Sequence, residues 1–272
     1  MIECTVLGPL SAKDGETPIA IGPPRHQKIL AMLLLNAGQV VTVARLISAL
    51  WPDRPPGTAR DQVHNGVSAL RRKLIQAGAR GEVITTSFAG VMLSKAAVDV
   101  DLHRVNALLS AAREASDRHA ASAALRRAVN QWTGPSLAGL TGSFFESMAS
   151  ALEERRLTAL EECIEHELEI VPAQRLVAEL TDVVAEYPVR ESFTRQLMLA
   201  LYRSGRPADA SAVYRRLRRR LHDELGVEPN PSLVELETAI LRLQIPMGAG
   251  PAPAVSAFGG GGAESFDLVV RV

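Results

Sequence analysis

Residues 58–93, TARDQVHNGVSALRRKLIQAGARGEVITTSFAGVML, decide the fold. Apolar residues recur in the first half at positions i, i+4, i+7 and i+11, namely Val63, Val67, Leu70 and Leu74. This spacing predicts a helix with one buried stripe, and Thr58 stands where it can cap that helix. Short strands at 82–86 and 91–93 then enclose a turn at 87–90. The stretch therefore predicts a helix followed by a β-hairpin.

The residues before this stretch complete the unit. They predict, in order, strands at 3–7, 10–13 and 18–21, a helix at 25–36, a short strand at 40–41 and a helix at 42–50 that Thr42 caps. Three prolines in the loop at 52–57 keep the connection to the next helix extended. Three helices followed by a hairpin are the order of a winged helix-turn-helix.

The segment from residue 99 to about 244 has helical patterns and no strand signals. We expect helices near 101–115, 117–132, 143–169, 173–186, 190–203, 207–222 and 231–243. The pair at 190–222 resembles a tetratricopeptide unit, because apolar positions follow a Gly turn at spacings of four and three. We therefore expect this segment to fold alone as a helical unit.

These patterns predict a mainly α protein with three parts. They are an α+β winged helix-turn-helix at 1–98, an all-α tetratricopeptide-like domain at 99–244 and a flexible Gly/Pro/Ala-rich tail at 245–272. Hydrophobic residues make up 47% of the 272 and aromatic residues only 4%, a composition that favours packed helices over β-sandwiches.

The charge distribution divides the chain in the same place. The net charge is zero, yet residues 1–98 carry 11 Lys/Arg against 6 Asp/Glu, and the remainder carries 19 against 24. A basic first part joined to an acidic remainder is typical of a nucleic-acid-binding module with a separate partner domain. Two cysteines, no basic leader and no apolar run of about 20 residues predict a soluble, cytoplasmic protein without a membrane partner.

The helix after Thr58 carries the candidate DNA contacts. The side opposite its apolar stripe holds Asp61, Asn65, Ser68 and Arg72, one flank holds Arg60, His64 and Arg71, and Lys73 completes the basic cluster 71–73. Asn, Ser and His side chains reach base edges, whereas Arg and Lys neutralise phosphates or read guanine. The sequence therefore predicts a recognition helix for double-stranded DNA; the alternative is an ordinary solvated helix face.

The turn at 87–90 is the expected wing, and Ser87 is its candidate DNA contact. The turn has no Lys or Arg, and the first cation after it is Lys95. Because minor-groove readers favour cationic side chains, this wing is electrostatically poor. The alternative is a plain hairpin that closes the small sheet.

Two charge runs in the helical part are interpreted as solvated faces. The basic run, Arg215, Arg216, Arg218, Arg219 and Arg220, points away from the apolar side of its helix and is expected to pair with Asp223, Glu224 and neighbouring helices. The alternative for this run is a second DNA site. The acidic run comprises Glu161, Glu162, Glu165, Glu167 and Glu169.

The sequence contains no pattern that indicates catalysis. Cys163 and His166 stand at i and i+3, but the cysteine lies in line with apolar positions and is better explained as a core thiol than as a metal ligand. The glycines at 259–262 lack the Lys that follows a phosphate loop, and no His-Glu-x-x-His, Gly-x-Ser-x-Gly or dinucleotide fingerprint occurs. We expect no enzyme activity, no catalytic residue, no metal and no cofactor.

Several motifs resemble the Streptomyces antibiotic regulatory proteins, the SARP family. They are VLGPL at 6–10, LISALWP at 46–52, VSALRRKL at 67–74, DLHR at 101–104, LMLALYRSGR at 197–206, VYRRL at 213–217 and DELGVEP at 223–229. The resemblance covers about residues 2–243. It implies an OmpR-type winged-helix domain followed by a bacterial transcriptional activator domain. Family wings carry a basic residue and Gly-Tyr, whereas this chain has Ser87, Phe88 and Val91 there.

The resemblance also implies a function. Such proteins activate secondary-metabolite (antibiotic) gene clusters by binding direct repeats near the −35 promoter region and recruiting RNA polymerase. Direct repeats imply two head-to-tail protomers on DNA. The loop at 52–57 is a polymerase-contacting element in OmpR-type proteins, so Asp53 and Arg54 are expected to face the sigma factor or the alpha C-terminal domain of RNA polymerase. The alternative is a passive connector with a buried Trp51.

Two other functions remain open from the residues alone. The first is a helical-repeat interaction module whose winged helix has become a protein-docking surface, an interpretation that the weak wing favours. The second is an ATP-responsive regulator that ends at its linker, which the tail composition permits and no motif supports.

Overall fold

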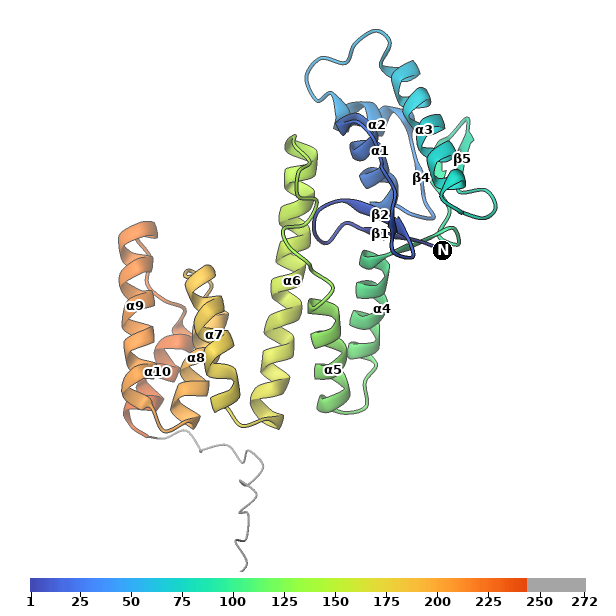
Figure 1. Ribbon diagram of the computed structural model, residues 1–272. Coiled ribbons are helices and arrows are strands. Elements are labelled where there is room, and N and C mark those ends of the chain that lie inside the picture. Colours follow the sequence, from blue (N-terminus) through green and yellow to red (C-terminus); the bar gives the residue numbers. More distant parts are fainter. Residues whose placement is uncertain (244–272) are drawn as a thin grey trace, which may run out of the picture.

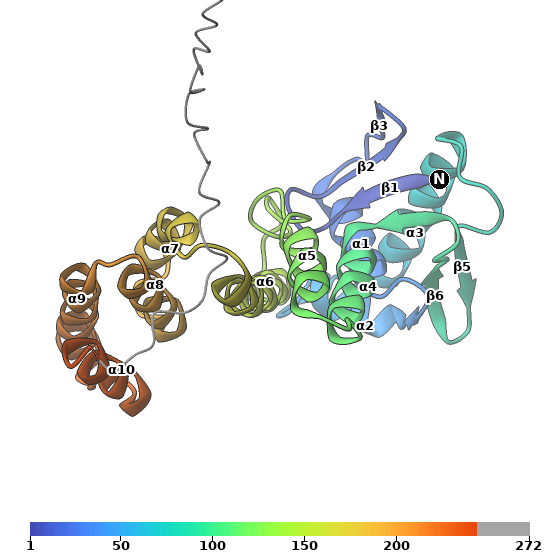
Figure 2. The ribbon, with the colours of Figure 1, turned by 90° about the horizontal axis from the view of Figure 1, so that it is seen from below.

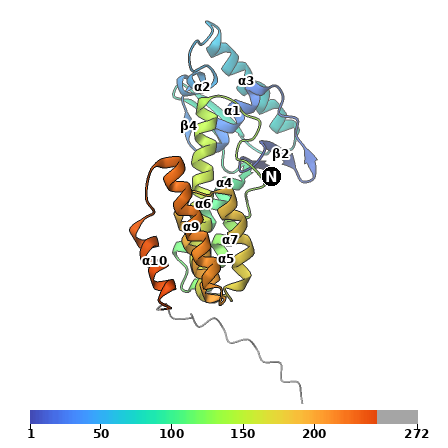
Figure 3. The same cartoon turned by 90° about the vertical axis from the view of Figure 1, so that its left-hand side faces the viewer.

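The computed structural model describes residues 1–243, and the predicted tail at 245–272 lies outside this range. Within these residues two small sheets and ten helices follow the predicted order, with one further strand at 98–100. The winged-helix region lies at one end, with the helical part extending away from it (Figure 1, Figure 3). The predicted fold class, a winged helix-turn-helix followed by a helical domain, is confirmed.

The first sheet has the strand order β3-β2-β1-β7. Its strands are β1 (Ile2–Thr5), β2 (Ser11–Asp14), β3 (Thr17–Pro18) and β7 (Val98–Val100). The strands β1, β2 and β3 are antiparallel neighbours, and β7 pairs parallel to β1 in the register Ile2↔Val98. Alternate residues of β1 face the core, which buries Ile2 and Cys4.

Three helices and a second sheet complete the winged helix. The helices are α1 (Pro24–Leu35), α2 (Val43–Leu50) and α3 (Ala59–Gln76), and the sheet β4-β6-β5 consists of β4 (Val40–Val41), β5 (Ile84–Ser87) and β6 (Gly90–Leu93). Thr42 caps α2 as predicted, because its hydroxyl accepts from the Arg45 N–H at 3.2 Å. The predicted cap at Thr58 is wrong: its hydroxyl accepts from the Gln62 side chain and leaves the backbone N–H groups of α3 uncapped.

The helical part comprises seven helices that pack mainly on their neighbours in sequence. They are α4 (Asp101–Arg113), α5 (Arg118–Val129), α6 (Ser143–Ile170), α7 (Gln174–Glu186), α8 (Glu191–Arg203), α9 (Pro207–Leu225) and α10 (Pro231–Leu241). Seen from below, α4 to α6 lie beside the winged helix, and α7 to α10 continue the row away from it (Figure 2). Among residues 1–243, no helix is both long and apolar enough to cross a membrane.

The two parts share one hydrophobic core at a junction that the sequence did not reveal. The buried Asp101 carboxylate accepts from the backbone N–H groups of Val6 and Leu7 at 2.9–3.1 Å and from that of Leu102 at 2.8 Å. Burial raises the pKa of this carboxyl, and the three donors counter that shift. Backbone N–H groups of the loop after α5 also donate to carbonyls of the segment after β1; that of Thr133, for example, lies 2.9 Å from the Leu7 oxygen. The expectation that no strand occurs after residue 98 is wrong, since the predicted boundary at 98/99 falls inside β7.

The acidic run on α6 is an ion-paired seam, which corrects its interpretation as a solvated face. Four of its five carboxylates bind arginines of α5 and of the α8 segment, in the pairs Glu167–Arg126, Glu161–Arg190, Glu165–Arg195 and Glu169–Arg203, while Glu162 stays exposed. The Glu167 side chain keeps only 13% of its surface exposed. The partners lie about 30 to 40 residues away in sequence, so local spacing could not reveal them.

Candidate nucleic-acid interface

Helix α3 is held by its apolar stripe, which leaves the predicted contact face outside. Val63, Val67, Leu70 and Leu74 are at most 2% exposed. Gly66 allows close packing on α1, because a Cβ there would come within 2.6 Å of the Ile29 side chain. The stripe therefore fixes the rotation of α3 about its axis.

The opposite side of α3 presents five of the predicted contacts to solvent. The exposed residues are Arg60, Asp61, Asn65, Ser68 and Arg72, and His64 is half-buried on the flank. Within residues 1–243, neither Arg60 nor Arg72 has a hydrogen-bond or ion-pair partner. Two unpaired guanidinium groups and short polar side chains on one exposed face are the groups that phosphates and base edges bind.

Arg71 and Lys73 lie in the same basic cluster but have internal partners. The Arg71 guanidinium donates to the Ile84 carbonyl at 2.7 Å and to the Thr86 hydroxyl at 2.8 Å, so it ties α3 to the wing strand β5. The Lys73 ammonium donates to the Ala20 carbonyl at 2.5 Å. These contacts correct the helix-wheel picture, because both long side chains reach back over the domain instead of projecting outward.

The wing is a tight hairpin with an apolar tip. Ser87 pairs with Gly90, so the loop is only Phe88 and Ala89. The predicted contact Ser87 uses its hydroxyl in the turn, where it accepts from the Ala89 N–H at 3.2 Å. Gly90 is required here, since its φ is +146° and a Cβ would lie 2.3 Å from the Val41 carbonyl.

The loop between α2 and α3 is exposed, as an interaction element requires. Asp53 and Arg54 are both exposed, and no side-chain partner of either lies within the described part of the chain. At the start of the loop, Trp51 is half-buried with the Arg25 guanidinium 5.1 Å from its ring centroid. The loop therefore begins at a fixed aromatic anchor and then leaves two opposite charges free.

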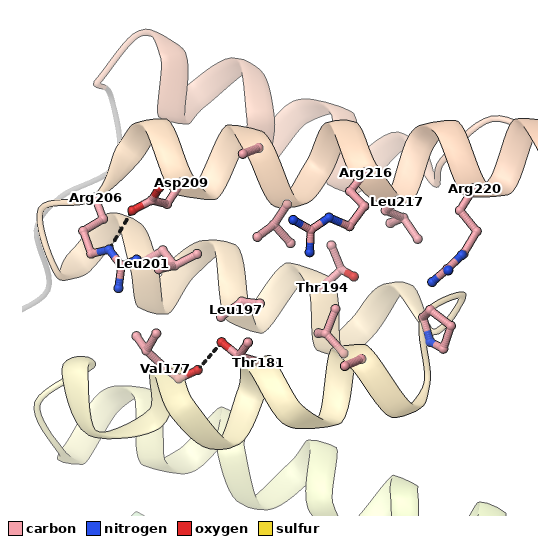
Figure 4. A pocket seen from close by; sticks show the side chains of 15 residues that line it. Val177, Thr181, Thr194, Leu197, Leu201, Arg206, Asp209, Arg216, Leu217 and Arg220 are labelled. Atoms are coloured by element: carbon pink, nitrogen blue, oxygen red, sulfur yellow. Dashed lines mark hydrogen bonds and ion pairs between the residues drawn. The ribbon is translucent and has the colours of Figure 1, made fainter.

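A groove of about 540 Å³ lies between α7, α8 and α9, far from α3 along the chain (Figure 4). Apolar side chains such as Val177, Leu197 and Leu217 line it. Arg216 and Arg220 extend from α9 toward it (Figure 4). The groove combines an apolar lining with positive charge at its edge.

The basic run on α9 is only partly paired. Arg220 binds Glu224 at 3.0 Å, as the sequence predicts, and Arg218 binds Glu228 at 2.9 Å. Arg215, Arg216 and Arg219 are exposed and have no acidic partner in the described range. The predicted pairing with Asp223 does not occur, so α9 keeps more free positive charge than the sequence suggested.

The predicted core thiol is confirmed. Cys163 is fully buried, and burial raises the pKa of its thiol to about 12. Burial likewise raises the pKa of the Cys4 thiol to about 12. The described residues contain no group of three or more His, Cys, Asp or Glu side chains that could hold a metal ion.

Two families match the chain in tandem. The family described as "Transcriptional regulatory protein, C terminal" matches residues 17–90, and the "Bacterial transcriptional activator domain" matches residues 100–241. The first covers the three helices and the wing, and the second covers the helical part. This is the domain order that the resemblance implied.

Two regulatory proteins from Streptomyces are similar to this chain over most of its length. The regulatory protein AfsR of Streptomyces coelicolor is 42% identical over 241 residues, which are 87% of this chain and 24% of AfsR. The regulatory protein DnrI of Streptomyces peucetius is 32% identical over 251 residues, 89% of this chain and 92% of DnrI. The chain thus spans about a quarter of AfsR and nearly all of DnrI.

A solved structure has the same fold. EmbR of Mycobacterium tuberculosis, in complex with a low-affinity phosphopeptide, superposes with a TM-score of 0.84 and 36% identity, over 90% of this chain and 66% of that one. The tandem family matches, the similarity along nearly the whole of DnrI and the structural match to EmbR therefore all indicate the same family. The chain belongs to the SARP family of transcriptional regulators, in which an OmpR-type winged helix precedes a bacterial transcriptional activator domain.

Proposed function

We propose that this protein is a sequence-specific transcriptional activator of a secondary-metabolite (antibiotic) gene cluster. It binds direct repeats near the −35 region of promoter DNA and recruits RNA polymerase. The observation that carries the proposal is the exposed face of α3, where two guanidinium groups and a row of short polar side chains have no partner within residues 1–243. No enzyme activity, metal or cofactor enters this function.

The residues on α3 divide into two kinds of contact. Asn65 and Ser68 lie in the middle of the exposed face and read base edges in the major groove, with Asp61 and His64 beside them. Arg60 stands at the first turn of α3, and Arg72 one turn from its C-terminal end. At these positions the two arginines neutralise phosphates on either side of the base contacts.

Arg71 and Lys73 act as positioning residues in this proposal. Arg71 holds the wing strand against α3, and Lys73 holds the segment before α1. Ser87 stabilises the turn of the wing. These three side chains fix the shape of the DNA-binding surface, so their substitution would change the relative placement of helix and wing.

Activation requires a polymerase contact, which we place on the loop between α2 and α3. Asp53 and Arg54 are exposed next to the N-terminal end of α3. They can therefore face the sigma factor or the alpha C-terminal domain of a polymerase bound at the same promoter. Two protomers on direct repeats lie head to tail, so each presents this loop in the same direction along the DNA.

The experiment is a selection followed by transcription. The full chain is incubated with a randomised duplex library, and bound DNA is amplified over several rounds and sequenced. The proposal expects a direct repeat, which then also occurs upstream of genes neighbouring the protein's own gene. In a purified system, the protein should raise transcription from a promoter that carries this repeat near −35. Recovery of unrelated sequences in every round would contradict sequence-specific binding.

A helical-repeat interaction module is the second candidate, and the groove between α7, α8 and α9 favours it. The two functions differ in what the winged helix does. A module that uses its winged helix for protein docking would select no DNA sequence. A chain that binds DNA but loses no transcription when the loop charges are removed would place the polymerase contact on the helical part, with the Arg216 and Arg220 edge of the groove as the surface to test next.

A further inference from the structure

The tip of the wing exposes an aromatic ring that nothing in the described protein covers. Phe88 is 105% exposed, more than any other large apolar residue within residues 1–243, where Met1 follows at 74%. Large aromatic side chains normally bury most of their surface, because transfer from water stabilises them. A fully exposed phenyl group on a two-residue loop is therefore a candidate contact for another molecule.

The ring stands on a rigid support. Gly90 packs directly on the Val41 carbonyl, β6 pairs with both β4 and β5, and the Ser87 hydroxyl accepts from the Ala89 N–H inside the turn. Exposure of Phe88 is thus set by the geometry of the hairpin, because a two-residue turn with these bonds cannot fold its tip back onto the domain.

The support also fixes the ring relative to α3. Arg71 bonds to Ile84 and Thr86 on β5, and Thr86 stands two residues before Phe88, or about 7 Å along a strand. Arg72, one of the two guanidinium groups of α3 without a partner in the described residues, directly follows Arg71 in the sequence. The arginine that clamps the wing is therefore the sequence neighbour of one that faces the proposed DNA, and its bonds hold β5 beside α3.

The chemistry of the tip selects the part of the DNA that it can contact. Residues 84–93 carry no charge, so this wing has no cation to neutralise a phosphate or to exploit the negative potential of a narrow groove as arginine does. Proteins that enter the minor groove also use apolar wedges, including Phe, which insert between base steps and partly unstack them. Pyrimidine–purine steps unstack most easily.

We propose that Phe88 is an apolar wedge that enters the minor groove beside the major-groove site of α3 and partly unstacks a flexible base step. The inference rests on the proposed DNA-binding function and adds a specificity determinant to it. Sequence preference arises at a TA or CA/TG step that no polar side chain contacts, because the energy of unstacking differs between steps. The wedge also bends the duplex toward the major groove.

The test uses the full chain and the duplex recovered by selection. A set of duplexes carries one 2-aminopurine each in place of successive adenines across and beside the repeat, because this base fluoresces more when it is unstacked. We expect a fluorescence rise at one step on the wing side of each repeat. Phe88→Ala should abolish the rise and weaken binding about 10-fold or more, with no change in the log–log salt slope.

Controls separate the wedge from the fold and from DNA binding itself. Val189→Ala removes an exposed apolar side chain from the helical part and should leave binding and fluorescence unchanged. Thermal unfolding of Phe88→Ala should match that of the parent, because no described residue covers the ring. If the parent binds its selected duplex and Phe88→Ala binds it equally well, the wedge is refuted while the proposed function stands. The absence of any fluorescence rise with the parent also refutes it, and a parent that selects no duplex refutes both.

Discussion

Replacement of Asp101 by Ala should destabilise the whole chain and uncouple its two parts. The carboxylate is 2% exposed and accepts three backbone N–H groups, two of them from the segment after β1. Alanine leaves these donors buried without an acceptor. The substitution therefore removes the hydrogen bonds that join the segment after β1 to the start of α4.

The expected loss follows from the donors left unpaired. Each buried donor without a partner costs about 1–3 kcal/mol. Water can reach part of the opened site, and the costs of the three donors do not simply add. We therefore expect the free energy of unfolding to decrease by about 3–5 kcal/mol. The matched control is Asp99→Ala, which removes a carboxylate only two residues away whose partner is Arg104 at 2.6 Å. Both side chains of that pair are more than a third exposed, so its loss should cost about 1 kcal/mol or less.

Two tryptophans make the coupling measurable. Trp51 follows α2 in the winged helix, and Trp132 follows α5 in the helical part, where its indole N–H donates to Ser136. Trp51→Phe and Trp132→Phe variants each keep one fluorescent reporter. Urea unfolding of the parent should give coincident transitions from both reporters, because one core spans the junction.

In the Asp101→Ala background the two transitions should separate, with the winged-helix reporter changing at lower urea. Equal unfolding free energies for Asp101→Ala and Asp99→Ala would refute the reasoning. Separate transitions in the parent would do so too, and would restore the expectation from sequence that the helical part folds alone.

Three further results follow from the structure. The double variant Asp53→Ala, Arg54→Ala should bind the operator with a free energy within about 0.5 kcal/mol of the parent, because both residues are exposed. It should nevertheless sharply lower transcription in a purified system. Equal transcription at matched promoter occupancy would move the activating surface to the helical part. Cys4 and Cys163 should resist a thiol reagent at pH 8 until urea unfolds the chain, because burial raises the pKa of each thiol to about 12 and keeps it protonated; rapid labelling of the native protein would contradict this. Burial and two nearby cations lower the pKa of His26 in the folded protein. As the pH falls below about 6.5, the imidazole is therefore protonated in the unfolded chain before it is protonated in the folded one, and the free energy of unfolding should decrease. His26→Gln should show a smaller drop in urea midpoint between pH 7.5 and 5.5 than the parent, and an identical drop would exclude this contribution.

The sequence predicted the elements well because their signals are local. The buried stripe on α3 could be recognised from the helical spacing of its apolar residues, and the hairpin from a turn between two short apolar runs. Strand β7 was not predicted, because three residues next to the start of a helix show little periodicity. Its partner β1 also lies almost a hundred residues earlier in the sequence. The role of Asp101 was hidden for the same reason, since two of its three donors reach it only through the tertiary structure.

The sequence predicted which face of α3 is exposed, but it predicted less well which side chains on that face are free to make contacts. A helix wheel gives the direction in which a side chain leaves the axis, and it placed Asn65, Ser68 and Arg72 outside as observed. It does not give the path of a long flexible side chain, so it could not show that Arg71 and Lys73 turn back to backbone carbonyls. Low charge in the wing was visible in the sequence, but the full exposure of its aromatic tip required the hairpin geometry.

The salt dependence of DNA binding by Arg72→Ala tests the central claim most directly. Affinity of the full chain for its selected duplex is measured by fluorescence anisotropy over a range of salt concentrations, beside Arg113→Ala, which removes an exposed charge from the far end of α4. If Arg72 holds a phosphate, its loss should weaken binding to all sequences alike and lower the log–log slope by about 0.9. If it reads a guanine, the loss should be about 1–3 kcal/mol at one operator position. An affinity and a slope equal to those of Arg113→Ala would contradict the assignment of α3 as the recognition helix.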